Sequence, residues 1–355
     1  MADLDELARS VEWHGDHLVV IDQTLLPAAL ELRPLRTVTD VVEAIRGLVV
    51  RGAPAIGVCG AFGVVIGLDE QPPADVEAAR QQLERVAVRL VAARPTAVNL
   101  RWAVERVVRA ARDAASTTDV RRRALAAAQR VADDDRASCQ RIAESGRREL
   151  ATAGHILTHC NTGRLATTGL GTALGVVYAK AAAGDTVEVL ATETRPLLQG
   201  ARLTAWELRD AGIPVTLLAD AATGSVMAQG LVDTVVVGCD RVARNGDTAN
   251  KVGTYTMAVL ADTHGLPFYV AGPMTSFDPD AAAGADIPIE QRDAHELLRA
   301  GGAVIAPDVP ALNPAFDVTP AGLITAFITD VGILRRPFEA SIAAALEEAQ
   351  RRGLR

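Results

Sequence analysis

Residues 155–175 read HILTHCNTGRLATTGLGTALG, and this stretch decides the fold. It opens with a short apolar run, continues as a loop rich in glycine and threonine, and becomes helix-forming near Thr172. A strand, a loop and a helix in this order predict one repeat of a parallel sheet, in which a crossover helix follows each strand.

Four further apolar runs follow, most of them at intervals that fit crossover helices: VEVLAT, IPVTLLAD, TVVVGCD and PFYVAG. We therefore expect an α/β fold whose C-terminal part is a Rossmann-like parallel sheet flanked by helices. In such sheets ligands bind at the carboxyl ends of strands, near the point where the strand order reverses. That rule selects five residues: Cys160, Glu193, Asp220, Asp240 and Gly272.

The first 149 residues follow a different pattern. The run HLVVIDQTLL, residues 17–26, predicts short strands, and helical spacing dominates from there to about residue 150. Segment 53–68 is rich in small residues, and three of its glycines recur on nearly one helix face, which indicates close helix packing. We expect an N-terminal domain of strands and helices at 1–149 and a Rossmann-like catalytic domain at 150–355.

The composition argues against several classes of protein. Hydrophobic residues make up 49% and charged residues 23%, and we expect no apolar run long and pure enough for a membrane span. The N-terminus MADLDELARSVEWHGD is acidic where a signal peptide is basic, so we expect a cytoplasmic protein. A net charge of −8 argues against a nucleic-acid partner. The four cysteines lack CxxC spacing, which supports neither disulfides nor structural zinc.

Cys160 stands where the first predicted strand should end. In one interpretation its thiol faces the cleft at the head of the sheet, beside helix amides that could lower its pKa. In the other it is a small buried hydrophobe, the most frequent fate of a free cysteine. We interpret His159 as a structural polar residue. The glycines of the following loop only approximate the dinucleotide fingerprint, so we do not expect nicotinamide binding.

Asp240 directly follows the uncharged run TVVVGC. Partial desolvation should raise the pKa of this carboxyl unless a cation compensates, which favours a general acid at neutral pH. The alternative is a loop aspartate paired with Arg241 or Arg244. A calcium loop does not fit, because Val242 and Arg244 occupy positions that require oxygen ligands. We therefore expect no metal.

Two arginines stand at predicted helix starts. Arg51, Gly52 and Ala53 precede a proline in VVRGAPAIGV, and Arg94 stands beside another in ARPTAVNLRW. An arginine and free amides at a helix N-terminus suit a phosphate group. Together with Lys251 and the glycine-rich loop, they predict one phosphate pocket.

Gln199 lies in the first turns of a helix predicted from LLQGARLTAWEL, after the strand end ETRP. The functional interpretation is recognition of sugar hydroxyls or phosphate. Capping and surface pairing form the alternative, which the spacing alone favours.

Eight segments, taken in order between about Val11 and Leu334, resemble the methylthioribose-1-phosphate isomerase family. They read VEWHGDHLVVIDQTLLP, VVRGAPAIGV, ARPTAVNLRWA, THCNTGRLATTGLGTALG, ETRPLLQGARLTAWEL, GCDRVARNGDTANKVGTY, PFYVAGP and NPAFDVTPAGLITAFITD. This family shares its fold with regulatory subunits of the eukaryotic translation-initiation guanine-exchange factor and with ribose-1,5-bisphosphate isomerases.

The resemblance implies an aldose–ketose isomerase of methionine salvage, which converts 5-methylthioribose 1-phosphate into 5-methylthioribulose 1-phosphate without a metal or nicotinamide cofactor. It implies a catalytic pair, Cys160 and Asp240, and a homodimer. The substrate-binding residues that it implies are Arg51, Gly52, Ala53, Arg94, Gln199, Asn250 and Lys251.

Three features depart from the family pattern. Cys239 replaces a usual alanine, and MTSFD follows PFYVAGP where the family tends to have STID-like sequences. Asp330 stands at the acidic position of the family's ITE motif. Two alternative functions stay open. One is an isomerase of another pentose 1-phosphate, either 5-deoxyribose 1-phosphate or ribose 1,5-bisphosphate. The other is a non-catalytic binding subunit like the translation regulators, which would need neither Cys160 nor Asp240.

Overall fold

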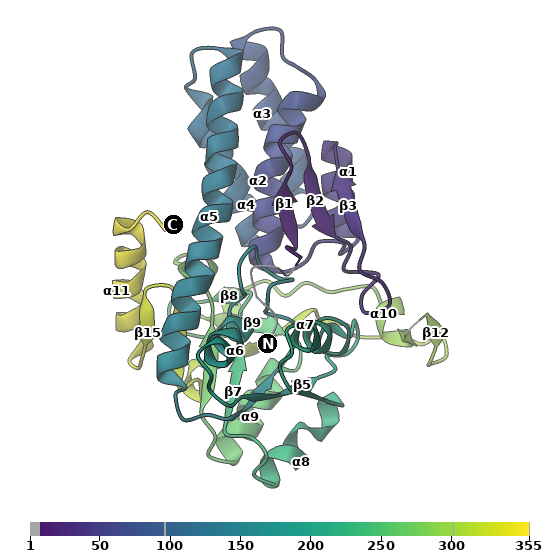
Figure 1. Cartoon of the computed structure of the whole chain (residues 1–355), viewed down its shortest axis with the longest axis vertical. Helices are drawn as coiled ribbons and strands as arrows, with labels where there is room; N and C mark the ends of the chain where they lie inside the picture. The colour runs from purple at the N-terminus through teal and green to yellow at the C-terminus, as the bar shows by residue number, and fades with distance from the viewer. Residues whose placement is uncertain (1–7, 96, 301, 355) are drawn as a thin grey trace. The chain divides into compact units, whose positions relative to one another are not determined.

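The computed structural model describes residues 8–95, 97–300 and 302–354 (Figure 1). Contacts divide them into a helical unit, residues 8–139 with 164–171, and a sheet unit, residues 140–163 with 172–354. We expected a domain boundary after residue 149, and a helix ends at that residue. The contacts instead divide this helix after Cys139, so the expected boundary stays a prediction. Residues 1–7, part of the segment that argued against a signal peptide, lie outside the described residues.

The helical unit combines a small antiparallel sheet with a helix bundle. Its elements are β1 (Val11–Trp13), β2 (Leu18–Ile21), β3 (Leu32–Leu35), α1 (Val38–Arg46), α2 (Ala53–Glu70), α3 (Val76–Val91), α4 (Val98–Arg112) and the first part of α5 (Thr117–Glu149). A capping box between Thr37 and Asp40 starts α1, because each side chain binds the other's backbone amide. The expected succession of short strands and helices is therefore observed.

Helix α2 forms the centre of this unit. A Cβ atom on Gly60 would lie 2.4 Å from Leu100 of α4, and one on Gly63 would lie 2.9 Å from Leu90 of α3. The expectation that the glycines of α2 allow close helix packing is confirmed. The same helix has the length and apolar composition of a membrane span, so the expectation that no such run exists was wrong. Most of its residues are buried among the other helices, as in a core helix.

The sheet unit is built on seven strands in the order β15-β14-β10-β7-β4-β5-β6. They are β4 (His155–Thr158), β5 (Glu188–Thr192), β6 (Val215–Leu218), β7 (Thr234–Val237), β10 (Phe268–Ala271), β14 (Ala326–Thr329) and β15 (Gly332–Leu334). All neighbours are parallel except β14 and β15. Counted from β4, the parallel strands follow the 3-2-1-4-5-6 order of a doubly wound sheet, which confirms the expected fold class.

Helices cover both faces of this sheet. Figure 1 shows α6 (Ala173–Ala182) and α7 (Ala205–Asp210) on one face, and α8 (Thr223–Ala228) and α9 (Thr254–Thr263) on the other. The remaining helices and strands are β8 (Arg241–Val242), β9 (Thr248–Lys251), α10 (His295–Leu298), β11 (Arg299–Ala300), β12 (Ala303–Val304), β13 (Phe316–Thr319) and α11 (Phe338–Arg351). Strands β13, β9 and β8 form a separate antiparallel sheet.

The strand order reverses between β4 and β7. From β4 the chain proceeds to β5 and β6 on one side, and then returns to β7 on the other. Leu157 pairs with Val235 in parallel register, and the Thr158 hydroxyl donates to the Val236 carbonyl at 2.8 Å. The carboxyl ends of β4 and β7 therefore meet at one edge of the sheet, where a doubly wound fold binds its ligand.

Candidate active site

Cys160 lies two residues beyond β4 and has a left-handed backbone, with φ of 64°. Its N–H donates to the Thr194 hydroxyl at 2.9 Å, and its carbonyl accepts from the Thr204 hydroxyl at 2.6 Å. A left-handed residue other than glycine costs about 1–3 kcal/mol and persists only where its surroundings enforce it. Cys160 is 6% exposed, but a core-filling role does not account for this enforced backbone. Burial fits the core interpretation and the enforced backbone fits the functional one, so a role of Cys160 in the reaction stays a prediction.

Asp240 follows β7 and is tied to the hairpin formed by β8 and β9. Its N–H donates to the Ala249 carbonyl at 3.0 Å. Two residues earlier, a Cβ on Gly238 would lie 2.6 Å from the Thr162 side chain, which belongs to the loop after Cys160. The structure thus brings together the two loops that carry Cys160 and Asp240.

Cys239 is a packed neighbour of Asp240. Burial raises the pKa of the Cys239 thiol to about 12, and the charge of Asp240 acts in the same direction. A Cβ on Gly272, just past β10, would lie only 2.3 Å from the Cys239 sulfur. The cysteine is accommodated because residue 272 is glycine, and it stays a thiol at neutral pH.

Asn250 and Lys251 end strand β9. Nδ2 of Asn250 donates to the Thr254 hydroxyl at 2.9 Å. Nζ of Lys251 donates to the Ala315 carbonyl at 2.8 Å and lies 5.0 Å from the centre of the Phe316 ring. Both side chains are almost fully buried, so their positions are fixed by the packing of β9 against β13.

Gln199 directly precedes the π-helical turn η1 (Gly200–Thr204), which leads into α7 in place of a regular helix start. Gly200 permits this turn, because a Cβ there would lie 1.7 Å from the Thr192 carbonyl oxygen. The buried side-chain oxygen of Gln199 has no hydrogen-bond partner among the described residues. Single π-turns often mark functional sites, and a buried acceptor without a partner indicates a place for a ligand donor.

The helical unit carries the other expected binding residues. Gly52 has φ of 91° and precedes the first residue of α2, Ala53, and a Cβ on it would lie 2.5 Å from the Ala166 carbonyl oxygen. The Ala55 N–H donates to that oxygen at 3.1 Å. The loop that begins at Cys160 therefore continues into the helical unit, against the segment of Arg51, Gly52 and Ala53.

Arg94 lies in the same unit, in the connection between α3 and α4. Helix α4 packs against the start of α2, since a Cβ on Gly57 would lie 3.0 Å from the Asn99 carbonyl oxygen. The expected binding residues thus fall into two sets. The helical unit carries Arg51, Gly52, Ala53 and Arg94, and the sheet unit carries Cys160, Gln199, Asp240, Asn250 and Lys251.

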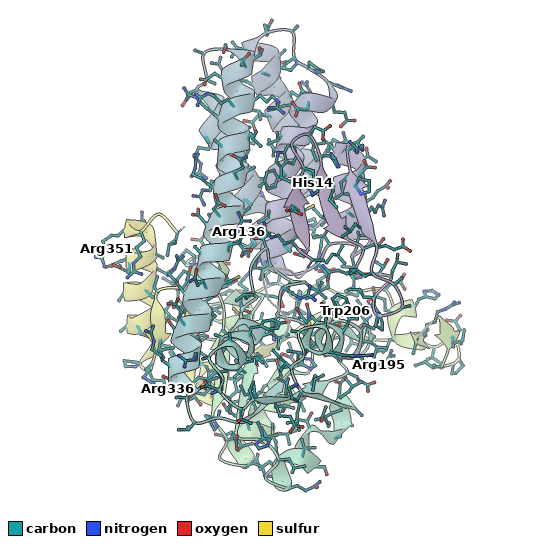
Figure 2. All side chains as sticks on the ribbon, in the orientation of Figure 1. His14, Arg136, Arg195, Trp206, Arg336 and Arg351 are labelled. Atoms are coloured by element: carbon teal, nitrogen blue, oxygen red, sulfur yellow. The ribbon has the colours of Figure 1, made fainter. Side chains whose placement is uncertain are left out.

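Other charged groups near the strand ends have structural partners. Arg241 pairs with Asp278 at 3.5 Å. The Asp247 carboxylate accepts the N–H groups of Ala321 at 2.9 Å and Gly284 at 3.0 Å. Arg195, labelled in Figure 2, donates to the Leu297 carbonyl at 2.8 Å. These contacts show that the three side chains help to fix the conformation of loops near the strand ends.

The pattern of the sequence did not identify the residues that hold the site in place. Thr194 and Thr204 bind the backbone of Cys160. The Asp220 carboxylate in turn accepts the N–H groups of Thr194 at 2.8 Å and Arg195 at 2.7 Å. Asp220 was selected only by its place at a strand end. Nothing in the sequence indicated Thr194 and Thr204, because a side-chain hydroxyl that binds a distant backbone group leaves no periodic pattern in the sequence.

Comparisons with known proteins agree with this architecture. The family described as the Initiation factor 2 subunit family matches residues 49–336. A protein of Desulfitobacterium hafniense (strain DSM 10664 / DCB-2) named methylthioribose-1-phosphate isomerase is 48% identical over 340 residues, covering 94% of this chain and 98% of that protein. A protein of Moorella thermoacetica named 5-deoxyribose 1-phosphate isomerase is 47% identical over 340 residues, covering 95% and 97%.

Two solved structures are also similar. The 5-methylthioribose 1-phosphate isomerase of Pyrococcus horikoshii OT3 superimposes with a TM-score of 0.89 at 42% identity, covering 96% of each chain. A structure from A. fulgidus, described as the translation initiation factor eIF-2B subunit delta, gives 0.86 at 43% identity, covering 96% of this chain and 100% of that one. Both kinds of protein thus share the fold.

Proposed function

The chain belongs to the Initiation factor 2 subunit family, and from this premise we propose that it is a methylthioribose-1-phosphate isomerase. It is an aldose–ketose isomerase that converts 5-methylthioribose 1-phosphate into 5-methylthioribulose 1-phosphate in methionine salvage. Full-length relatives at 48% identity that carry this name support the assignment. The observation that carries it is the enforced left-handed backbone of Cys160, next to the strand end of Asp240.

The substrate poses a specific chemical problem. Its anomeric carbon is a phosphate ester, so a free aldehyde cannot form without loss of phosphate. We assign to Asp240 the donation of a proton to the ring oxygen as the C1–O bond of the ring breaks. A carboxyl group in a partly desolvated position can hold that proton at neutral pH.

The hydrogen on C2 must then reach C1. In one route Cys160 accepts it as a proton, an enol forms between C1 and C2, and C1 is reprotonated while the C2 hydroxyl loses its proton to become the ketone. In the other route the hydrogen moves with its electron pair as a hydride to C1, which ring opening has left electron-deficient, and the C2 hydroxyl again loses its proton to become the ketone. Both routes end in the same ketose phosphate.

Substrate binding is assigned to the two sets of residues described above. Arg51, Gly52 and Ala53 offer a guanidinium and amides at a helix start, which suits a phosphate. Lys251 adds a point charge, and Gln199 offers an amide whose buried oxygen can accept from a sugar hydroxyl. The assignment includes Arg94 and Asn250 on the strength of the family resemblance.

The second candidate function is isomerisation of 5-deoxyribose 1-phosphate, because a relative at 47% identity carries that name. The two substrates differ only in the group on C5. Parallel assays with methylthioribose 1-phosphate, 5-deoxyribose 1-phosphate and ribose 1,5-bisphosphate separate these functions. We expect the highest kcat/KM with the methylthio sugar, and product formation in the presence of EDTA and without nicotinamide.

The assay also tests the assignment as an enzyme. Failure to form ketose from any of the three sugar phosphates would contradict it and favour a non-catalytic binding subunit; the similar A. fulgidus structure is described as a subunit of a translation initiation factor. We further propose a cytoplasmic homodimer, without nucleic-acid or membrane partners. Light scattering after size-exclusion chromatography should give twice the mass of one 37.2 kDa chain.

A further inference from the structure

We propose that His159 is a positioning residue that joins the catalytic and phosphate-binding parts of the sheet unit. It lies between the strand end that carries Cys160 and the turn that follows Lys251, and it holds them at a fixed separation as a neutral imidazole. The proposal rests on the function assigned to those two residues.

Both ring nitrogens of His159 have polar partners on different elements. Nε2 lies 2.8 Å from the Val252 carbonyl oxygen, and Nδ1 lies 2.6 Å from the Thr192 hydroxyl at the end of β5. A carbonyl can only accept, so Nε2 carries the hydrogen. In the neutral ring Nδ1 then accepts the hydrogen of the Thr192 hydroxyl. One side chain thereby binds β5 and the turn after β9.

The ring also packs directly on that turn. Gly253 has φ of 107°, and a Cβ there would lie 3.0 Å from both Cε1 and Nε2 of His159. On its other side the turn is held by Asp317, whose carboxylate accepts the Gly253 N–H at 2.7 Å. The backbone next to Lys251 is therefore fixed from two sides, by His159 and by Asp317.

The Thr192 contact leads to Cys160. The Thr194 hydroxyl accepts the Cys160 N–H and lies within 3.3 Å of the Thr192 carbonyl oxygen, to which it donates. His159 is also the residue directly before Cys160 in the chain. A shift of its ring would move the backbone that presents the thiol.

Electrostatics keep the imidazole neutral. Burial lowers the pKa of His159, which is 2% exposed, and the positive charge of Lys251 acts in the same direction. The hydrogen bond to Val252 and the charge of Asp220 oppose this shift. A second ring hydrogen would also leave the Thr192 hydroxyl without its acceptor on Nδ1.

Two amide variants separate the two contacts. Glutamine at position 159 can place a donor where Nε2 stands and keep the Val252 bond, whereas asparagine can place an acceptor where Nδ1 stands and keep the Thr192 bond. His159→Asn should raise both KM and the Kd for inorganic phosphate about tenfold, as for one lost hydrogen bond. His159→Gln should leave both within about threefold of the parent and should lower kcat instead.

His155 provides the matched control. It stands at the other end of β4, its side chain is 55% exposed, and it pairs with Asp233 at 3.3 Å. His155→Gln should leave kcat, KM and phosphate affinity unchanged. A merely structural His159 would give equal losses in both amide variants, in proportion to their thermal stability and without any split between KM and kcat. That outcome would overturn the proposal.

A spectroscopic readout makes the test independent of turnover. Nitrogen-15 spectra of histidine-labelled protein, assigned by comparison with His159→Gln, should show a neutral ring with hydrogen on Nε2 at pH 6. A protonated ring, or hydrogen on Nδ1, would refute the bridge. If this tautomer and the split in phosphate affinity are seen while no sugar phosphate is isomerised, the proposed function fails and the positioning role stands.

Discussion

The hydroxyl of Thr204 donates a hydrogen bond to the carbonyl of Cys160 across 2.6 Å. Thr204→Val keeps the shape of the side chain and removes the donor, which leaves a buried carbonyl without its partner. We expect the free energy of unfolding to fall by about 1–3 kcal/mol. We also expect kcat to fall about tenfold or more, because the thiol loses its fixed position. Urea unfolding and steady-state kinetics measure the two effects, and an unchanged kcat would contradict a link between this bond and catalysis.

Asp240→Asn should abolish turnover and leave the melting temperature close to that of the parent. The amide cannot donate the proton that the ring oxygen needs, whereas the N–H bond to Ala249 involves only the backbone and persists. An active Asn variant would remove Asp240 from the role of acid.

Cys160→Ser should lower kcat strongly if the thiol takes part in the reaction. A Ser variant with near-normal kcat would return Cys160 to the role of a buried core residue.

The two routes for the C2 hydrogen predict different isotope patterns. When the reaction runs in deuterated water, a proton route through an enol exchanges the hydrogen with solvent, whereas a hydride shift retains it. Substantial deuterium on C1 of the product, seen by NMR, would exclude the hydride route. The product of a parallel reaction in ordinary water, incubated with enzyme in deuterated water, gives the background exchange.

Gly272→Ala should destabilise the protein by about 1–3 kcal/mol, since the new methyl group would overlap the Cys239 sulfur. Cys239→Ala in the same chain should restore most of that loss, because it removes the atom in the way. A double-mutant cycle of urea unfolding measures the interaction between the two positions. Additive effects of the two changes would show that Cys239 does not fill the space beside Gly272.

The burial of His159 predicts that the stability of the folded protein depends on pH. Burial lowers its pKa in the folded state below the ordinary value of about 6.5 for the unfolded chain. The unfolded chain therefore binds more protons in this range, so the free energy of unfolding should fall as the pH drops below about 6.5. The carboxylates with lowered pKa, such as Asp40 and Asp233, titrate in a more acidic range. In His159→Gln the decline between pH 6.5 and 5 should be smaller, and an equal decline in both proteins would contradict the assignment.

Much of the fold follows from local patterns in the sequence. The five apolar runs became the parallel strands β4, β5, β6, β7 and β10, and their spacing was enough to locate the strand ends that carry Cys160 and Asp240. The glycines of α2 likewise indicated tight helix contacts. In each case the signal lies within one element and its immediate neighbours.

The rest depends on contacts between distant segments. Asn250 and Lys251 lie on β9, a strand outside the apolar runs of the sequence, because that segment pairs with residues 316–319. The left-handed Cys160 and the π-helical turn after Gln199 depend on close approaches to Thr194, Thr204 and Thr192. No single-sequence pattern encodes such approaches.

The contacts of Lys251 have a consequence for the thermodynamics of binding. Ordering a free lysine side chain costs about 1.5–2 kcal/mol of conformational entropy. The ammonium group of Lys251 is already held by the Ala315 carbonyl and the face of Phe316. A phosphate that binds there would meet a preorganised cation, so little side-chain entropy remains to be lost. Replacing Phe316 with alanine would restore that freedom, and calorimetry should then record a more unfavourable entropy of phosphate binding.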